Sequence, residues 1–132
     1  MTEFIEKLMP EEKPDLDRIE LLAKNGGEPD VEEYLNEGNA IEARSKGGRA
    51  LAQEAAGYGN LDILRLCVAL GGDTRGALHL ASMNGHLAAV KYLVEHVQVD
   101  INATNEQGYR PLACAFLHPD VQAYLLSRGG VR

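Results

Sequence analysis

The chain has 132 residues, of which 45% are hydrophobic and 25% are charged, values typical of one folded domain with a single core. The formal net charge is −7, so the chain lacks the strong positive field that nucleic-acid binding requires. No apolar run approaches the roughly 20 residues that cross a bilayer, and the acidic start is unlike a secretory signal. We therefore expect a cytoplasmic protein with no nucleic-acid and no membrane partner.

Residues 1–14 are predicted to form an acidic extension of the domain. They include three large apolar side chains, Phe4, Ile5 and Leu8, and each would forgo about 1.5–3 kcal/mol of burial if it stayed exposed. We therefore expect these side chains to dock against the domain, with a mobile tail as the alternative. The wider region 1–42 contains thirteen Asp and Glu against four Lys and Arg, which favours a solvated helix face, with a surface for a basic partner as the alternative.

A helix is predicted over residues 15–25, directly after Pro14, a residue that is favourable at a helix start. Its apolar residues share one face, and its Asp and Glu residues share the other. A polar outer face is what the terminal unit of a stacked array requires for solubility. The apolar face is formed by Leu16, Ile19, Leu22 and Ala23.

Small, apolar and glycine positions recur 33 residues apart along the chain. Gly26 recurs as Gly59, and Gly38 recurs as Gly71. A period of this length predicts an array of stacked units, and the pattern continues to residue 130 with irregular outer copies. We predict four helix–turn–helix units within residues 15–130. Their boundaries are 15–47, 48–73, 74–107 and 108–130.

The third unit shows most clearly why such a unit cannot stand alone. Its first helix has a face of small and apolar residues, the dipeptide Asn84-Gly85 suits a tight turn, and its second helix carries an apolar stripe at Leu87, Val90, Leu93 and Val94. So short a helix pair is marginal alone. Stacking covers its apolar face with the next unit, so the array is the folding unit.

These residues resemble the ankyrin repeat, whose unit of about 33 residues carries a T-P-L-H-x-A motif, two antiparallel helices and a β-turn finger. The segments "GALHLAS" and "RPLACAF" stand at the first helix, "NGHLAAVKYLV" at the second helix, and "VDINATNEQGY" at the finger. The resemblance implies an all-α solenoid of about four repeats. It also implies a protein that binds other proteins and catalyses no reaction.

The finger between the second and third units is predicted to be truncated. Gly59 and Gly85 are 26 residues apart, seven fewer than a full period of about 33. The short segment "GGDTRG" stands in place of the finger. It leaves a gap in the row of fingers, which we call the notch. Asn102, in the following full finger, resembles an asparagine that is hydroxylated in some members of the family.

The resemblance places partner recognition on the finger tips and on the exposed side of each first helix. Tyr58, Met83 and Tyr109 are the expected anchors, because aromatic and Met side chains supply contact area, although Tyr58 has structural packing as a rival role. The full set of expected partner-binding residues is Lys46, Arg49, Tyr58, Arg75, Met83, Asn84, Glu106, Gln107 and Tyr109.

Basic residues gather at or beside the predicted finger positions. Stacking would align them on one edge, where repeated charges create a shared field that attracts an acidic partner surface. The alternative is that they are scattered solubility charges. The residues of this basic edge are Arg44, Lys46, Arg49, Arg75 and Arg110.

The sequence offers little for catalysis, metal binding or cofactors. No two of His86, His96 and His118 lie at the spacing of a metal site, and Cys67 and Cys114 are expected to be buried free thiols. We predict no metal, no cofactor and a structural role for His79 at a helix start.

Three hypotheses about function follow. The first is a monomeric, non-catalytic module that binds another protein as an adaptor, scaffold or inhibitor. The alternative is a small-ligand or enzymatic site at the notch of the shortened finger, near Asp73, Arg75 and His79. The third is that the chain is the repeat domain of a longer protein.

Overall fold

The computed structural model describes residues 17–132, and within that range the chain forms helices and no strand. The predicted all-α class is therefore confirmed. The expected docking of Phe4, Ile5 and Leu8 lies outside the described residues. The helices are α2 (Arg18–Asn25), α3 (Glu28–Asn36), α4 (Leu51–Tyr58), α5 (Leu61–Ala69), α6 (Ala77–Met83), α7 (Leu87–Tyr92) with a π-helical continuation η1 (Leu93–Val97), α8 (Pro111–Cys114) and α9 (Pro119–Ser127).

Helix α2 begins at Arg18, three residues later than predicted, because Asp17 is its N-cap. The Asp17 carboxylate accepts a hydrogen bond of 2.9 Å from the backbone N–H of Ile19. An aspartate at this position satisfies one helix N–H group and interacts favourably with the positive end of the helix. Pro14 and Leu16, both part of that prediction, lie outside the described residues.

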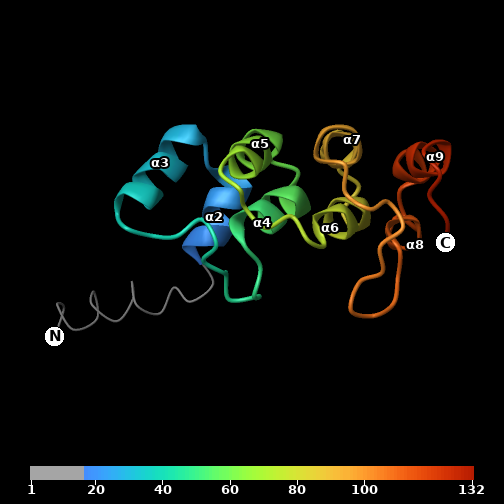
Figure 1. Cartoon of the computed structure of the whole chain (residues 1–132), viewed down its shortest axis with the longest axis horizontal. Coiled ribbons are helices and arrows are strands. Elements are labelled where there is room, and N and C mark those ends of the chain that lie inside the picture. Colours follow the sequence, from blue (N-terminus) through green and yellow to red (C-terminus); the bar gives the residue numbers. More distant parts are fainter. Residues whose placement is uncertain (1–16) are drawn as a thin grey trace, which may run out of the picture.

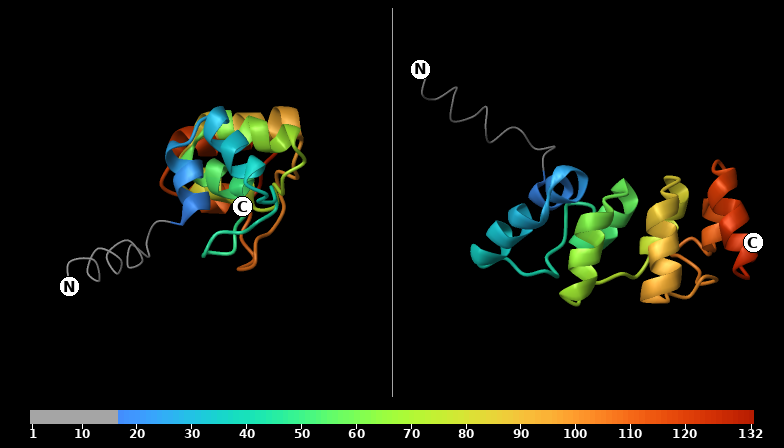
Figure 2. Two further views of the ribbon diagram at one scale, coloured as in Figure 1. Left: turned by 90° about the vertical axis from the view of Figure 1, so that its left-hand side faces the viewer. Right: turned by 90° about the horizontal axis from the view of Figure 1, so that it is seen from above.

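The helices are arranged in two layers along one line. Figure 1 shows α2, α4, α6 and α8 in an inner row and α3, α5, α7 and α9 in an outer row. Figure 2 (right) shows the outer helices side by side, and the main contacts between pairs in the described residues join neighbouring pairs. This arrangement is the predicted helical solenoid, with four described helix pairs.

The core runs through the whole stack rather than around one centre. The inner helices contribute small side chains such as Ala55, Ala56 and Ala81, all of them fully buried, which lets neighbouring helices approach closely. The outer helices contribute larger side chains such as Leu64 and Leu93. The predicted apolar stripes are therefore buried between units, as stacking requires.

Successive units contact each other at the turn between the inner and the outer helix of each pair. The His118 ring shares a hydrogen bond of 2.9 Å, through Nε2, with the backbone carbonyl of Met83 in the preceding unit. The ring also lies directly over Gly85, where an added Cβ would be 2.4 Å from His118 Nδ1. His86 covers Gly59 in the same way, one unit earlier. Each of these histidines is thus a structural contact between neighbouring turns.

Two long fingers and one short connection join the helix pairs. Residues 37–50 and 98–110 form the long fingers, which extend from the same side of the stack in Figure 2 (left). Both tips close with one backbone pattern, from Ser45 N–H to the Arg49 carbonyl at 2.8 Å and from Asn105 N–H to the Tyr109 carbonyl at 2.9 Å. The connection between α5 and α6 spans only residues 70–76, so the predicted truncation is confirmed.

The two cysteines are buried and free, as predicted. Burial raises the pKa of the Cys67 thiol to about 12 and also raises the pKa of Cys114. A thiol that stays protonated is a poor nucleophile and a poor metal ligand. Both cysteines therefore act as small apolar residues of the core.

The contact between His118 and Gly85 predicts a large effect of Gly85→Ala on stability. The backbone φ of Gly85 is +75°, which strains a residue with a Cβ by about 1–2 kcal/mol, and overpacking against the ring adds about 1–3 kcal/mol. We expect a loss of about 3 kcal/mol in the free energy of unfolding, measured by urea denaturation followed by circular dichroism.

The matched control is Gly108→Ala. Gly108 has a φ of +85° but open space around the position of a Cβ, so this variant carries the backbone strain alone. We expect it to lose about 1–2 kcal/mol. Equal losses in the two variants would show that the His118 ring does not oppose a side chain at residue 85.

Candidate functional site

A hollow of about 430 Å³ lies on the exposed side of three successive inner helices. It brings together residues that are far apart in the chain, from α2, α4, α6 and the first long finger. Three of the expected partner-binding residues, Arg49, Tyr58 and Asn84, line it. The full lining is Glu20, Arg49, Glu54, Gly57, Tyr58, Leu80, Asn84 and His86.

The floor of the hollow is held in shape by Gly57 and Asn84. The Asn84 side-chain amide donates a hydrogen bond of 2.7 Å to the Gly57 carbonyl, which ties α6 to α4. A Cβ on Gly57 would lie 3.6 Å from the Cβ of Leu80, so the glycine leaves this space to the hollow. Tyr58 and Leu80 add apolar surface to the same site. Asn84 therefore shapes the floor of the hollow that it lines.

Charged side chains sit at the base of the same hollow. Glu54 has only 7% of its side chain exposed, and its nearest cation is the Arg49 guanidinium at 3.6 Å. Burial raises the pKa of Glu54, Arg49 opposes that rise, and the Glu20 carboxylate adds to it. The hollow thus combines two carboxylates and one guanidinium with apolar walls, a mixture typical of protein interfaces.

The expected anchors Tyr58 and Met83 are exposed beside the hollow, at the ends of α4 and α6. The bond between Asn84 and Gly57 places these two helix ends next to each other. The third expected anchor, Tyr109, is exposed at the tip of the second long finger. The anchors thus form one adjacent pair and one separate residue.

Three of the remaining expected residues, all except Arg75, lie on two finger tips that are not neighbours in the stack. Lys46 is at the tip of the first long finger, and its backbone N–H donates to Asp17 at 2.6 Å. Glu106 and Gln107 are exposed at the tip of the second, where the Asn105 side chain accepts bonds from the N–H groups of Gln107 and Tyr109. These tips are separated along the stack by the missing finger.

An ion-pair network fills the notch where the third finger is absent. Asp73 accepts a hydrogen bond of 2.8 Å from Arg44 of the first finger and bonds from the backbone and guanidinium of Arg75. These bonds, first of all those from Arg75, hold the pKa of Asp73 well below its usual range. Gln53 joins the same network through Arg44 at 3.1 Å and through the carbonyl of Arg75. Asp73 is therefore a structural anion.

His79 is a structural residue, as expected. Its Nε2 lies 2.7 Å from the carbonyl of Ala103 and 3.1 Å from that of Tyr109, so the ring holds the base of the second long finger. Asp73 instead contacts the first finger. The expected alternative site of Asp73, Arg75 and His79 is divided between two different fingers, and no described contact joins His79 to the other two.

Sequence reasoning missed five residues of the hollow: Glu20, Glu54, Gly57, Leu80 and His86. The repeat alignment contained one signal for the hollow. Glu54 lies 33 residues after Leu21 and 26 before Leu80, so it occupies a position that is apolar in the units on either side. A carboxylate placed there is exceptional within the array and marks the hollow.

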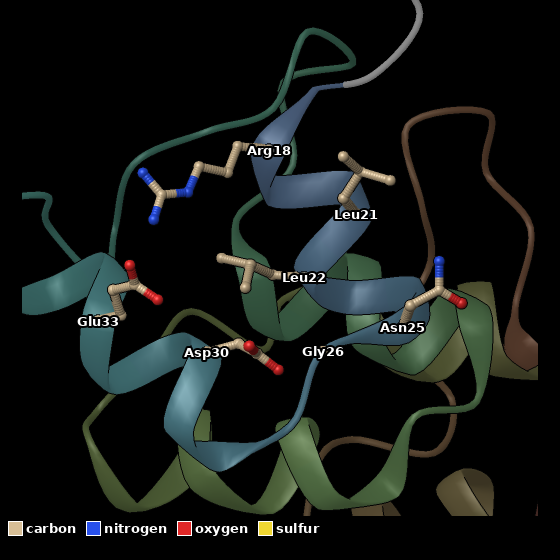
Figure 3. Close-up of a pocket in the computed structure, with 7 residues that line it drawn as sticks. All are labelled: Arg18, Leu21, Leu22, Asn25, Gly26, Asp30 and Glu33. Atoms are coloured by element: carbon tan, nitrogen blue, oxygen red, sulfur yellow. The ribbon is translucent and has the colours of Figure 1, made fainter.

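A second, smaller hollow of about 280 Å³ lies between α2 and α3 at the first described unit. Figure 3 shows Arg18 extending from α2 on the same side as Glu33 of α3. The Arg18 guanidinium donates to both Glu37 oxygens, at 2.7 and 2.5 Å, and stacks 5.2 Å from the centre of the Tyr34 ring. These contacts join α2 to α3, so we assign this hollow to packing of the first pair.

Within residues 17–132, no group of three or more His, Cys, Asp or Glu side chains could hold a metal ion. Nor does any helix there have the length and apolar character needed to span a bilayer.

The comparison with known families gives a direct match to the repeated units. A family model described as "Ankyrin repeats (3 copies)" matches residues 19–105 and matches again at residues 53–131. The two matches together extend over all four described helix pairs.

The network at the notch predicts a pH-dependent effect of Asp73→Asn. Since the folded-state pKa of Asp73 lies below the unfolded value of about 3.9, the carboxylate stabilises the fold above that value. This contribution is lost as the pH falls towards the folded-state pKa. We expect Asp73→Asn to lower the free energy of unfolding at neutral pH, with a smaller difference from the natural chain in acid.

Urea titrations at neutral pH and near pH 3 measure this difference. Glu106→Gln, which removes one exposed carboxylate from a finger tip, is the control and should leave stability nearly unchanged at both pH values. A deficit of Asp73→Asn that is the same at both values would contradict a stabilising charge at this site.

Proposed function

The chain belongs to the ankyrin repeat family, and we propose that it is a non-catalytic protein–protein interaction module that binds its partner on the exposed side of the inner helices. Members of this family are generally such modules. The observation that carries the proposal is the hollow over α2, α4 and α6, flanked by the exposed anchors Tyr58 and Met83.

The composition of this surface suits a protein partner. Binding energy at interfaces is concentrated in a few buried anchors surrounded by polar groups, and aromatic, Met and Arg side chains are enriched there. Tyr58 and Met83 provide apolar contact area. Asn84 and Arg49, which line the hollow, provide hydrogen-bonding groups. A partner segment that lies along the inner helices contacts all four.

The finger tips add a second group of contacts to the proposed interface. Lys46 on the first long finger, and Glu106, Gln107 and Tyr109 on the second, are all exposed. They come from the two ends of the stack, so only a partner that spans several units reaches both. We therefore place Tyr58 and Met83 at the centre of the interface and the finger tips at its rim.

We also propose that the partner carries acidic groups where it meets the basic edge. Arg75 is mostly exposed although it pairs with Asp73, and Asp73 has a second cation in Arg44. Arg75 can therefore turn towards a partner carboxylate without leaving Asp73 unpaired. Arg44 and Arg110 serve the fold instead, because Arg110 donates to the carbonyl of Arg132 at 2.8 Å.

A cytoplasmic location fits the two free cysteines. Disulfides form and persist in oxidising compartments, whereas thiols stay reduced in the cytosol.

The central test is the double variant Tyr58→Ala with Met83→Ala. Partners are first captured with the full natural chain and identified, and their affinity for each variant is then measured by calorimetry. We expect the double variant to bind at least about tenfold more weakly, a loss of about 1.4 kcal/mol or more. Leu70→Ala, which removes an equally exposed apolar side chain near the end of α5, should bind like the natural chain. Unchanged affinity in the double variant would overturn the proposed interface.

The charge of the partner is tested separately with Lys46→Gln and Arg75→Gln together. Loss of two cations that face an acidic surface should slow association and weaken its dependence on salt concentration. The control, Arg65→Gln with Lys91→Gln, removes the same charge from the outer helices. If the two pairs of substitutions change the association rate equally, the partner does not recognise the basic edge.

A further inference from the structure

The hollow over the inner helices has more acidic than basic groups in its lining. Glu20 and Glu54 supply two carboxylates, and Arg49 supplies the one guanidinium. These carboxylates come from α2 and α4, which are neighbours in the inner row of Figure 1. The formal charges of the lining therefore favour a cation, in contrast to those of the basic edge on the fingers.

Glu54 is the more important of the two carboxylates because it is buried. Only 7% of its side chain is exposed, and the Arg49 Nη1 atom is 3.6 Å from its Oε1. A closed hydrogen bond between a cationic N–H group and a carboxylate is about 2.7–2.9 Å long. Burial raises the pKa of Glu54, and Arg49 and Ser45 oppose this rise without cancelling it. The negative charge of Glu54 is therefore only partly compensated within the chain.

Glu20 adds a second carboxylate to the hollow from α2. It is half-buried, and among residues 17–132 it has no ion pair. Its charge is close enough to Glu54 to contribute to the raised pKa of that residue. A cation placed beside both carboxylates relieves their repulsion and offsets the cost of burying them.

The walls of the hollow suit an arginine side chain. Tyr58 and Leu80 provide apolar surface, and Gly57 leaves space between α4 and α6, where no side chain fills it. The guanidinium group of arginine is planar, stacks on aromatic rings and pairs with carboxylates through two N–H groups. It is also less strongly hydrated than the ammonium group of lysine. These properties match an aromatic wall beside a buried carboxylate.

Charge distinguishes an arginine from other side chains that a partner could insert. An acidic side chain would meet two carboxylates, and like charges that approach across an interface oppose binding. An apolar side chain would complete the burial of Glu54 and Glu20 without adding a cation, which is costly. Only a cationic side chain compensates the two carboxylates, as a second cation beside Arg49.

We propose that the hollow binds an arginine side chain of the partner protein, with its guanidinium paired to Glu54 and Glu20 and stacked on Tyr58. This inference rests on the proposed function, because it names the group that the partner inserts between the inner helices. It is compatible with acidic groups elsewhere on the partner, since Lys46 and Arg75 of the basic edge do not line the hollow.

Titration of the full chain with Nα-acetyl-arginine amide, followed by amide NMR spectra, tests the proposal. We expect saturable chemical-shift changes at Gly57, Tyr58, Leu80 and Asn84, with millimolar affinity and one site per chain. Nα-acetyl-lysine amide should bind several-fold more weakly. Nα-acetyl-glutamine amide, which has no charge, should give no saturable change. The proposal is wrong if the arginine compound gives none either, or if either of the other two compounds binds as tightly.

The variant Glu54→Gln should bind the arginine compound at least about tenfold more weakly, a loss of about 1.4 kcal/mol. Its unfolding midpoint in urea at neutral pH should be no lower than that of the natural chain. The reason is that an acid whose folded-state pKa is raised destabilises the fold when it is ionised. Glu20→Gln should give a smaller loss of binding.

The matched control is Glu32→Gln, which removes an exposed carboxylate from α3 in the outer row and should bind the arginine compound like the natural chain. Unchanged binding in Glu54→Gln, or equal losses in Glu54→Gln and Glu32→Gln, would contradict a site at the hollow.

Failure of this inference differs from failure of the proposed function. If the hollow does not take arginine, the arginine compound does not bind the natural chain, whereas Tyr58→Ala with Met83→Ala still loses affinity for the captured partner. If the proposed interface is wrong, that double variant keeps its full affinity for the partner, whatever the arginine compound does.

Discussion

Burial of one helix pair by the next is the interaction on which this structure depends. Each pair has a polar side and an apolar side, and none is long enough to be stable alone. The buried alanines of the inner helices and the large apolar residues of the outer helices form one continuous core that runs through neighbouring units. Stability is therefore a sum over neighbouring contacts. The histidines over Gly59 and Gly85 add a packing contact between units, and His118 adds a hydrogen bond.

The shortened connection between α5 and α6 shows how the array tolerates an irregular unit. Finger contacts normally support the stack from one side, and here residues 70–76 are too few to form a finger. Asp73 replaces it with an ion pair to Arg44, which lies 29 positions earlier on the preceding finger. The arginines at this notch thus have structural partners, and Arg75, the more exposed of the two, has the larger surface to offer to another protein.

The repeats, the turns and the missing finger were predictable from sequence because each is a local or periodic property. Counting the spacing of Gly26, Gly59 and Gly85 was sufficient to locate them. The hollow as a whole was not predictable, because its lining comes from three units. Its one signal in the sequence was Glu54, at a position that is apolar in the units on either side. Within its own helix Glu54 is an ordinary polar residue, and only the stacking of the units buries it.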